Sequence, residues 1–128
     1  MARGGHVVLL VEDNVETAEV LERLLALRNY DVIHATDGLD ALAMLRGGFV
    51  PDVIVLDLWM PNVDGRAFRT ALMADPALAR IPVIVYSVDP GTPPVPDVVG
   101  HVRKGTDAPD RLLALIEQAC RHAGPPRP

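Results

Sequence analysis

The chain has 128 residues, a length typical of one domain that buries its own core. Apolar residues make up 49% and charged residues 23%, as in ordinary globular proteins, and the formal charge of −5 argues against direct binding to nucleic acid or to an anionic membrane. No apolar run approaches the roughly 20 residues of a membrane span, and the N-terminal segment lacks the apolar core and cleavage site of a signal peptide. We therefore expect a cytoplasmic location and no membrane insertion.

Apolar runs alternate with segments of helical periodicity along most of the chain. In chain order the pattern predicts a strand at 6–13, a helix at 14–29, a strand at 30–37, a helix at 38–48, a strand at 52–57, a helix at 65–75, a strand at 81–87, a weaker strand at 99–104 and a helix at 107–124. The strands are continuous apolar runs, which indicates a parallel sheet covered on both faces. The sequence thus predicts an α/β fold with a doubly wound, five-stranded parallel sheet.

Three of the predicted helices have a distinct apolar side, which we expect to face the sheet. The inward side chains are Ala18, Leu21, Leu24, Leu25 and Leu27 in the first helix, Phe68, Ala71 and Leu72 in the third, and Leu112, Leu113, Ile116, Ala119 and Cys120 in the last. Because the chain has a single cysteine, an internal disulfide is excluded.

One segment breaks the alternation of strands and helices. Residues 88–98, VDPGTPPVPDV, contain four prolines. A proline inside a helix costs roughly 3 kcal/mol and removes a hydrogen-bond donor. We therefore expect a proline-rich loop, with at most one short turn, where a parallel sheet normally has a crossover helix. The proline-rich end of the chain, 125–128, is expected to be a tail or linker stub after a domain that spans 1–124.

Polar side chains gather where the predicted strands end. Glu12 and Asp13 follow the first strand, Asp57 the third, Ser87 the fourth and Lys104 the fifth. In open parallel sheets, ligands bind beyond the carboxyl ends of the strands. The ends of four separate strands therefore bring three carboxylates, a hydroxyl and an ammonium toward one place.

Such a cluster has a definite chemistry. Three crowded acids repel one another and are stabilised by protonation or by a cation. An all-oxygen ligand set suits a hard ion such as Mg²⁺, which takes carboxylates, waters and phosphate oxygens. A lysine and a serine at the same place supply donors for phosphoryl oxygens, and an aspartate can form an aspartyl-phosphate. Asp57 is thus placed for a metal-assisted phosphoryl transfer.

The segments at these strand ends resemble those of a known family. They are VEDN (11–14), VLDLWMPNVDG (55–65), VIVYS (83–87) and VRKG (102–105), of which the second is the most specific. With them, the chain resembles the receiver domain of bacterial two-component response regulators, and in particular the chemotaxis regulators. This resemblance implies a flavodoxin-like strand order, 2-1-3-4-5. It also implies that the partners are a sensor histidine kinase or phosphotransfer protein and an unidentified downstream protein.

The resemblance also implies a role for each residue of the cluster. Asp57 would accept the phosphoryl group and, with Asp13, bind Mg²⁺ directly. Glu12 would bind the metal through water, and the backbone carbonyl of Trp59 would complete the protein ligands. Ser87 would move toward the phosphoryl group, and Lys104 would pair with its oxygens. The only chemistry implied is the protein's own phosphorylation and dephosphorylation, so we do not expect an enzyme in the usual sense.

The sequence departs from the family pattern in four places. Gly105 follows Lys104, where the family usually has a proline after a cis peptide bond, so we expect a trans bond here. His101 occupies the place of an aromatic switch residue, and we interpret it as a partly buried polar side chain rather than a sensor, although its protonation or rotation could couple to the site. The interval from Ser87 to Lys104 is 17 residues, shorter than is usual, and the missing length coincides with the proline-rich segment. Val88 is bulkier than the usual alanine, and we hypothesise that it narrows access to the phosphoryl group.

Two other functions compete with that of a phosphorylated switch. An atypical receiver could serve as a protein-interaction module that does not depend on phosphorylation, which the altered Lys104–Gly105 pair and the missing helix favour and the intact cluster opposes. A small hydrolase or phosphatase could use Asp57 as its nucleophile. Against this, the position two residues later is Trp59 rather than a second acid, and no inserted segment is available to hold a substrate.

Overall fold

The computed structural model describes residues 5–59, 64–89, 95–105, 107 and 109–122. It contains one five-stranded parallel sheet in the order β2-β1-β3-β4-β5. The strands are β1 (Val7–Val11), β2 (Asp31–Ala35), β3 (Val53–Leu56), β4 (Val83–Ser87) and β5 (Gly100–Arg103). The helices are α1 (Val15–Ala26), α2 (Gly38–Arg46), α3 (Gly65–Met73), the short 3₁₀ helix η1 (Leu78–Arg80) and α4 (Pro109–His122). The predicted doubly wound fold and its strand order are confirmed.

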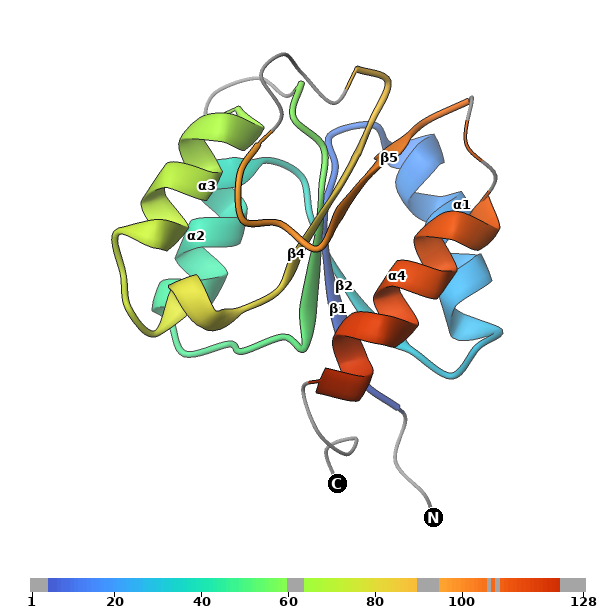
Figure 1. Cartoon of the computed structure of the whole chain (residues 1–128), viewed down its shortest axis with the longest axis horizontal. Coiled ribbons are helices and arrows are strands. Elements are labelled where there is room, and N and C mark those ends of the chain that lie inside the picture. The colour runs from blue at the N-terminus through green and yellow to red at the C-terminus, as the bar shows by residue number, and fades with distance from the viewer. Residues whose placement is uncertain (1–4, 60–63, 90–94, 106, 108, 123–128) are drawn as a thin grey trace.

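The helices cover both faces of the sheet. Figure 1 shows α2 and α3 on one side and α1 and α4 on the other. Successive residues of β1 supply both layers: Leu9 and Val11 pack on the α2–α3 side, while Val8 and Leu10 pack on the α1–α4 side. This explains why the strand is apolar at every position, since side chains alternate between two buried faces.

Asparagine and aspartate side chains fix where three helices begin. Asn14, Asp37 and Asp64 are the N-caps of α1, α2 and α3, and each accepts a hydrogen bond from the backbone N–H three residues later. An N-cap of this kind satisfies one of the free donors of the first helical turn. Two of these caps, Asn14 and Asp64, follow closely on the polar strand ends and so fix the chain on either side of the candidate site.

Most of the predicted inward side chains are buried, with one clear error. The set predicted for α4 is buried throughout, and Leu24 and Ala71 are half-buried. Leu27, however, is 80% exposed. The prediction was wrong because α1 ends at Ala26 and Leu27 is its C-cap, so the helical period no longer decides which way the side chain points.

The connection from β4 to β5 contains no helix in its described part, residues 88–89 and 95–99. Val95, only 3% exposed, packs into the core on the α2–α3 side, and Val98 packs against it. One loop valine thus provides part of the cover that a crossover helix would give. Three of the four prolines, at 90, 93 and 94, lie outside the described residues, as does the predicted tail at 125–128. Among the helices of the described ranges, none is long and apolar enough to cross a membrane.

Candidate functional site

The carboxyl edge of the sheet brings the predicted residues together. Glu12 directly follows β1, Asp57 directly follows β3 and Lys104 directly follows β5. Ser87 is the last residue of β4. These four strands are neighbours in the sheet and are paired in parallel, so their ends meet at one edge. The convergence predicted from the strand ends is therefore present in the structure.

Asp57 is buried, at 5% exposure, and its carboxylate has three polar neighbours. Its Oδ1 accepts hydrogen bonds from the Ser87 hydroxyl at 2.9 Å and from the Trp59 backbone N–H at 3.2 Å. Its Oδ2 lies 3.4 Å from Lys104 Nζ. A buried carboxylate is costly unless it is paired and hydrogen-bonded, and this arrangement meets both conditions.

Glu12 and Lys104 form the shortest contact of the site, with 2.5 Å between Oε1 and Nζ. Glu12 is 1% exposed, and its Oε2 accepts a hydrogen bond from the Asn14 backbone N–H. Burial raises the pKa of Glu12, and the hydrogen bond and charge of Lys104 only partly oppose this shift. For Lys104, burial favours a lower pKa, but the hydrogen bond to Glu12 and the two carboxylate charges outweigh it, so its pKa is raised and it stays protonated.

Asp13 supplies a third, exposed carboxylate at the same edge. One oxygen each from Glu12, Asp13 and Asp57 lies within 4.8 Å of the other two. Three acidic oxygens at this spacing, with one acid open to solvent, fit a hard divalent cation that keeps several waters. The Trp59 backbone lies beside the cluster, because its N–H bonds to Asp57. Its carbonyl as a metal ligand stays a prediction.

The loop after β3 is held in place by two further contacts. Gly65 packs so tightly against this loop that an added Cβ would lie 2.5 Å from Leu58 Cα and 2.6 Å from the Asp57 carbonyl oxygen. The indole Nε1 of Trp59 donates a hydrogen bond of 2.7 Å to the Asp89 carbonyl, which joins the loop after β3 to the segment after β4. The position of Asp57 thus depends on a glycine that no other residue can replace without a shift.

Two side chains of the site were not predicted from the sequence. His34 in β2 donates through Nε2 to the Glu12 carbonyl at 2.6 Å, and so supports the backbone of Glu12. The Tyr86 ring lies under Lys104, with Nζ 5.5 Å from the ring centroid, a cation–π distance. Neither residue follows a strand end, so the pattern of polar strand ends does not indicate them. The strand order is the signal that could have found them, because β2 borders β1 and β4 borders β5.

Lys104 contacts Glu12 and Asp57 although Gly105 and His101 beside it depart from the family pattern. Gly105 has φ of +77°, a conformation that glycine adopts without strain, and the Lys104 backbone N–H bonds to the Ser87 carbonyl at 2.9 Å. The chain therefore turns away after Lys104 without a proline. His101 is half-buried, and its Nε2 has no partner among the described residues. This partial burial fits a polar side chain with a structural role, and a switch role for His101 stays an alternative that the structure does not test. The trans bond before Gly105 stays a prediction.

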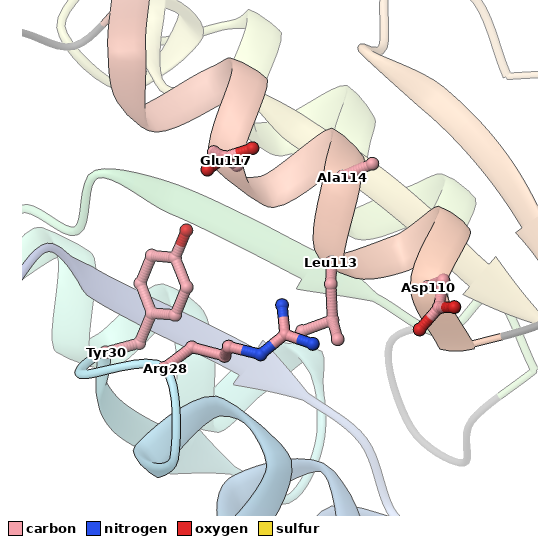
Figure 2. Close-up of a pocket in the computed structure, with 6 residues that line it drawn as sticks. All are labelled: Arg28, Tyr30, Asp110, Leu113, Ala114 and Glu117. Atoms are coloured by element: carbon pink, nitrogen blue, oxygen red, sulfur yellow. The ribbon is translucent and has the colours of Figure 1, made fainter.

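A separate hollow of about 360 Å³ lies away from these residues. Figure 2 shows Arg28 and Tyr30 on one side of it and Asp110, Leu113 and Glu117 of α4 on the other. None of the clustered acids lines it. Its charged side chains are of both signs, and we assign it no part in the chemistry of the site.

Comparison with protein families agrees with the fold. Residues 8–106 match the family model described as the response regulator receiver domain. The chain belongs to this family, which confirms the resemblance seen in the strand-end motifs.

Individual relatives cover the chain to different extents. It is 34% identical over 113 residues to protein Rrf1 of Nitratidesulfovibrio vulgaris, covering 88% of this chain and 80% of that one. It covers only 17% of a longer curated response regulator, PleD of Caulobacter vibrioides, to which it is 38% identical over 80 residues. Among solved structures, the Mn²⁺-bound form of response regulator Rcp1 is 27% identical, with a TM-score of 0.73 over 91% of this chain and 90% of that one. The phosphorylated cyanobacterial phytochrome response regulator RcpA is 28% identical, with a TM-score of 0.71 and the same coverage.

Proposed function

We propose that this chain is a phosphoryl-accepting receiver, in which Asp57 takes the phosphoryl group from the phosphohistidine of a sensor histidine kinase or a phosphotransfer protein. The observation that carries the proposal is the buried Asp57 carboxylate, held between the Ser87 hydroxyl and the Lys104 ammonium beside two further acids. The phosphorylated state of RcpA, a structural neighbour, supports the same chemistry here.

We propose a divalent cation, Mg²⁺, as the cofactor of this step. Asp13 and Asp57 would bind it directly, Glu12 through water, and the Trp59 carbonyl would complete the protein ligands. When bound, the ion offsets the repulsion among the acids and neutralises charge on the phosphoryl oxygens. The Mn²⁺-bound form of Rcp1 supports a divalent cation at such a site.

In the transfer itself, an oxygen of the Asp57 carboxylate forms a bond to phosphorus as the bond from phosphorus to the donor's imidazole nitrogen breaks. The donor histidine leaves as neutral imidazole after it takes a proton. Ser87, which now donates to Asp57 Oδ1, would turn its hydroxyl to a phosphoryl oxygen. Lys104 Nζ lies 2.5 Å from Glu12 Oε1 and 3.4 Å from Asp57 Oδ2. Because it already lies beside the Asp57 carboxylate, it would move only a short way to pair with an oxygen of a phosphoryl group on that carboxylate.

Phosphorylation would then change the surface that the downstream protein binds. The alternative, a binding module that does not depend on phosphorylation, predicts an inert site. Beryllofluoride, which imitates a phosphoryl group on an aspartate, separates the two when it is added with Mg²⁺ and followed by Trp59 fluorescence. Trp59 is a suitable reporter because its backbone N–H bonds to the Asp57 carboxylate and its side chain is 55% exposed.

We expect beryllofluoride to cause a saturable fluorescence change in the parent protein already loaded with Mg²⁺, beyond any change that Mg²⁺ alone causes, and we expect beryllofluoride to cause no change when Mg²⁺ is left out. The matched control is Asp57→Asn, which keeps the shape of the side chain but cannot hold the beryllium group, and we expect no change there. A parent protein that responds no more than Asp57→Asn would favour the phosphorylation-independent module.

A further inference from the structure

A buried arginine lies on α3, outside the site described above. Arg69 is 6% exposed and sits in the helix beside Phe68 and one turn from Leu72, both fully buried. Its Nη2 donates a 2.6 Å hydrogen bond to the Asp97 carbonyl. Its Nε and Nη1 are covered from solvent and have no acceptor among the described residues. Burial lowers the pKa of Arg69, and the charge of Asp97 only partly opposes this.

This pattern is unusual because of what a guanidinium requires. It carries five N–H donors and a permanent charge, and buried charges are normally paired with an anion. Among the described residues, the hydrogen-bond partner of Arg69 is a neutral carbonyl, and the Asp97 side chain is exposed at the surface. Within the described part of the chain, two of the three nitrogens of the Arg69 guanidinium group therefore have no acceptor.

Arg69 also lines a cleft of about 250 Å³ between α3 and the segment that enters β5. The α3 wall is formed by Arg66, Arg69, Thr70 and Met73, and the opposite wall by residues 95–97. Figure 1 shows this segment passing beside α3, where a doubly wound fold normally has a crossover helix. The cleft is thus a product of the shortened connection, and it holds two arginines in a chain whose net charge is −5.

We propose that this cleft binds a small organic anion, a carboxylate or a phosphate monoester carried on an apolar body. The planar guanidinium of Arg69 matches the oxygens of either group, and Arg66 adds a second positive charge at the same cleft. Met73, Val95 and Pro96 provide the apolar wall. The Asp97 carboxylate opposes an anion at the rim, so the ligand needs both arginines and the apolar contact. None of the residues that line this cleft belongs to the Asp57 cluster, so the proposal does not rest on Asp57 phosphorylation.

An anion that pairs with Arg69 competes with the Asp97 carbonyl for the guanidinium. Because the free donors are covered, we expect binding to move the 95–97 segment away from α3. Backbone amides of α3 and of residues 97–99 should therefore report on binding together, while those around Asp57 in metal-free buffer should not.

The test is a titration of the ¹⁵N-labelled protein in metal-free buffer at constant ionic strength, followed by amide chemical shifts. The probes are benzoate, phenyl phosphate and the neutral benzyl alcohol. We expect saturable shifts at Arg66–Met73 and at 97–99 with one or both anions, and the tighter anion identifies the class of ligand. Arg69→Met, which keeps the length and loses the charge, should weaken binding at least tenfold, whereas the exposed Arg46→Gln should leave it unchanged.

Three results would overturn the proposal: no saturable shift at α3 with either anion, equal binding of benzyl alcohol, or equal affinity in Arg69→Met. If Arg69→Met does not fold, the comparison of the anions with benzyl alcohol in the parent protein decides the question alone.

Discussion

Replacing Lys104 with methionine tests how the two buried acids are held at the sheet edge. Methionine keeps an unbranched side chain of similar length and removes only the ammonium that lies 2.5 Å from Glu12 and 3.4 Å from Asp57. These acids are 1% and 5% exposed, so the substitution leaves two nearly buried carboxylates without their cationic partner. Removing one partner of a buried ion pair costs about 3–5 kcal/mol.

We expect the lower end of that range, because the Lys104 side chain is itself 16% exposed. A loss of about 3 kcal/mol in the free energy of unfolding corresponds to roughly 10 °C in Tm for a domain of this size. The assay is urea unfolding followed by circular dichroism at pH 7.5 in metal-free buffer. Arg103→Met is the matched control, since Arg103 is the adjacent, exposed cation, and we expect it to change stability by at most about 0.5–1 kcal/mol.

The loss of stability in Lys104→Met should also depend on pH, in a direction that follows from the pKa of Glu12. Burial already raises the pKa of Glu12, and the hydrogen bond and charge of Lys104 that oppose the shift are lost in Lys104→Met. A folded-state pKa above the unfolded value means that protonation favours the folded state, so stability is gained as the pH falls. The deficit of Lys104→Met should therefore shrink between pH 7.5 and pH 5. A loss below about 1 kcal/mol, or one that does not change with pH, would show that Lys104 is an ordinary solvated lysine.

Three further predictions concern other parts of the fold. Gly65→Ala places a Cβ 2.5 Å from Leu58 Cα, so we expect a loss of about 1–3 kcal/mol in urea unfolding together with slower phosphorylation; parent-like values would contradict the packing. Val88→Ala, at a 61% exposed position, should alter stability by less than about 0.5 kcal/mol but speed the loss of the phosphoryl group from Asp57, and an unchanged rate of loss would refute the hypothesis that Val88 narrows access. Burial raises the pKa of Cys120 to about 12, so Ellman's reagent at pH 8 should label it only in denaturant, and rapid labelling of the native protein would be inconsistent with that burial.

The fold was predictable because the two buried faces of the sheet make its strands apolar throughout. The five apolar runs and the helical periods between them located every strand and long helix, and the four prolines predicted the missing crossover helix in the described part of that connection. Helix ends were less certain. Leu27 continues the apolar spacing of α1 but lies after its last residue, and no local pattern shows that α1 ends at Ala26.

The sequence predicted which residues gather at the candidate site, but it did not predict which of their side chains are in contact. Parallel strands end at a common edge, so Glu12, Asp57, Ser87 and Lys104 could be brought together from their positions alone. Which acid Lys104 contacts more closely depends on side-chain geometry that no spacing encodes. The burial of Arg69 was also missed, because an arginine inside an amphipathic helix is normally assigned to the solvent side, and only the folded connection before β5 covers it.

The most direct measurement is mass spectrometry of the intact protein and its peptides after incubation with a small phosphodonor such as acetyl phosphate. With Mg²⁺, the parent protein should gain one phosphoryl group, located on the peptide that contains Asp57. The gain should be absent without a divalent metal and absent in Asp57→Asn. No phosphoryl group on the parent, or one that persists at another residue in Asp57→Asn, would contradict the assignment of this acidic edge as a phosphoacceptor site.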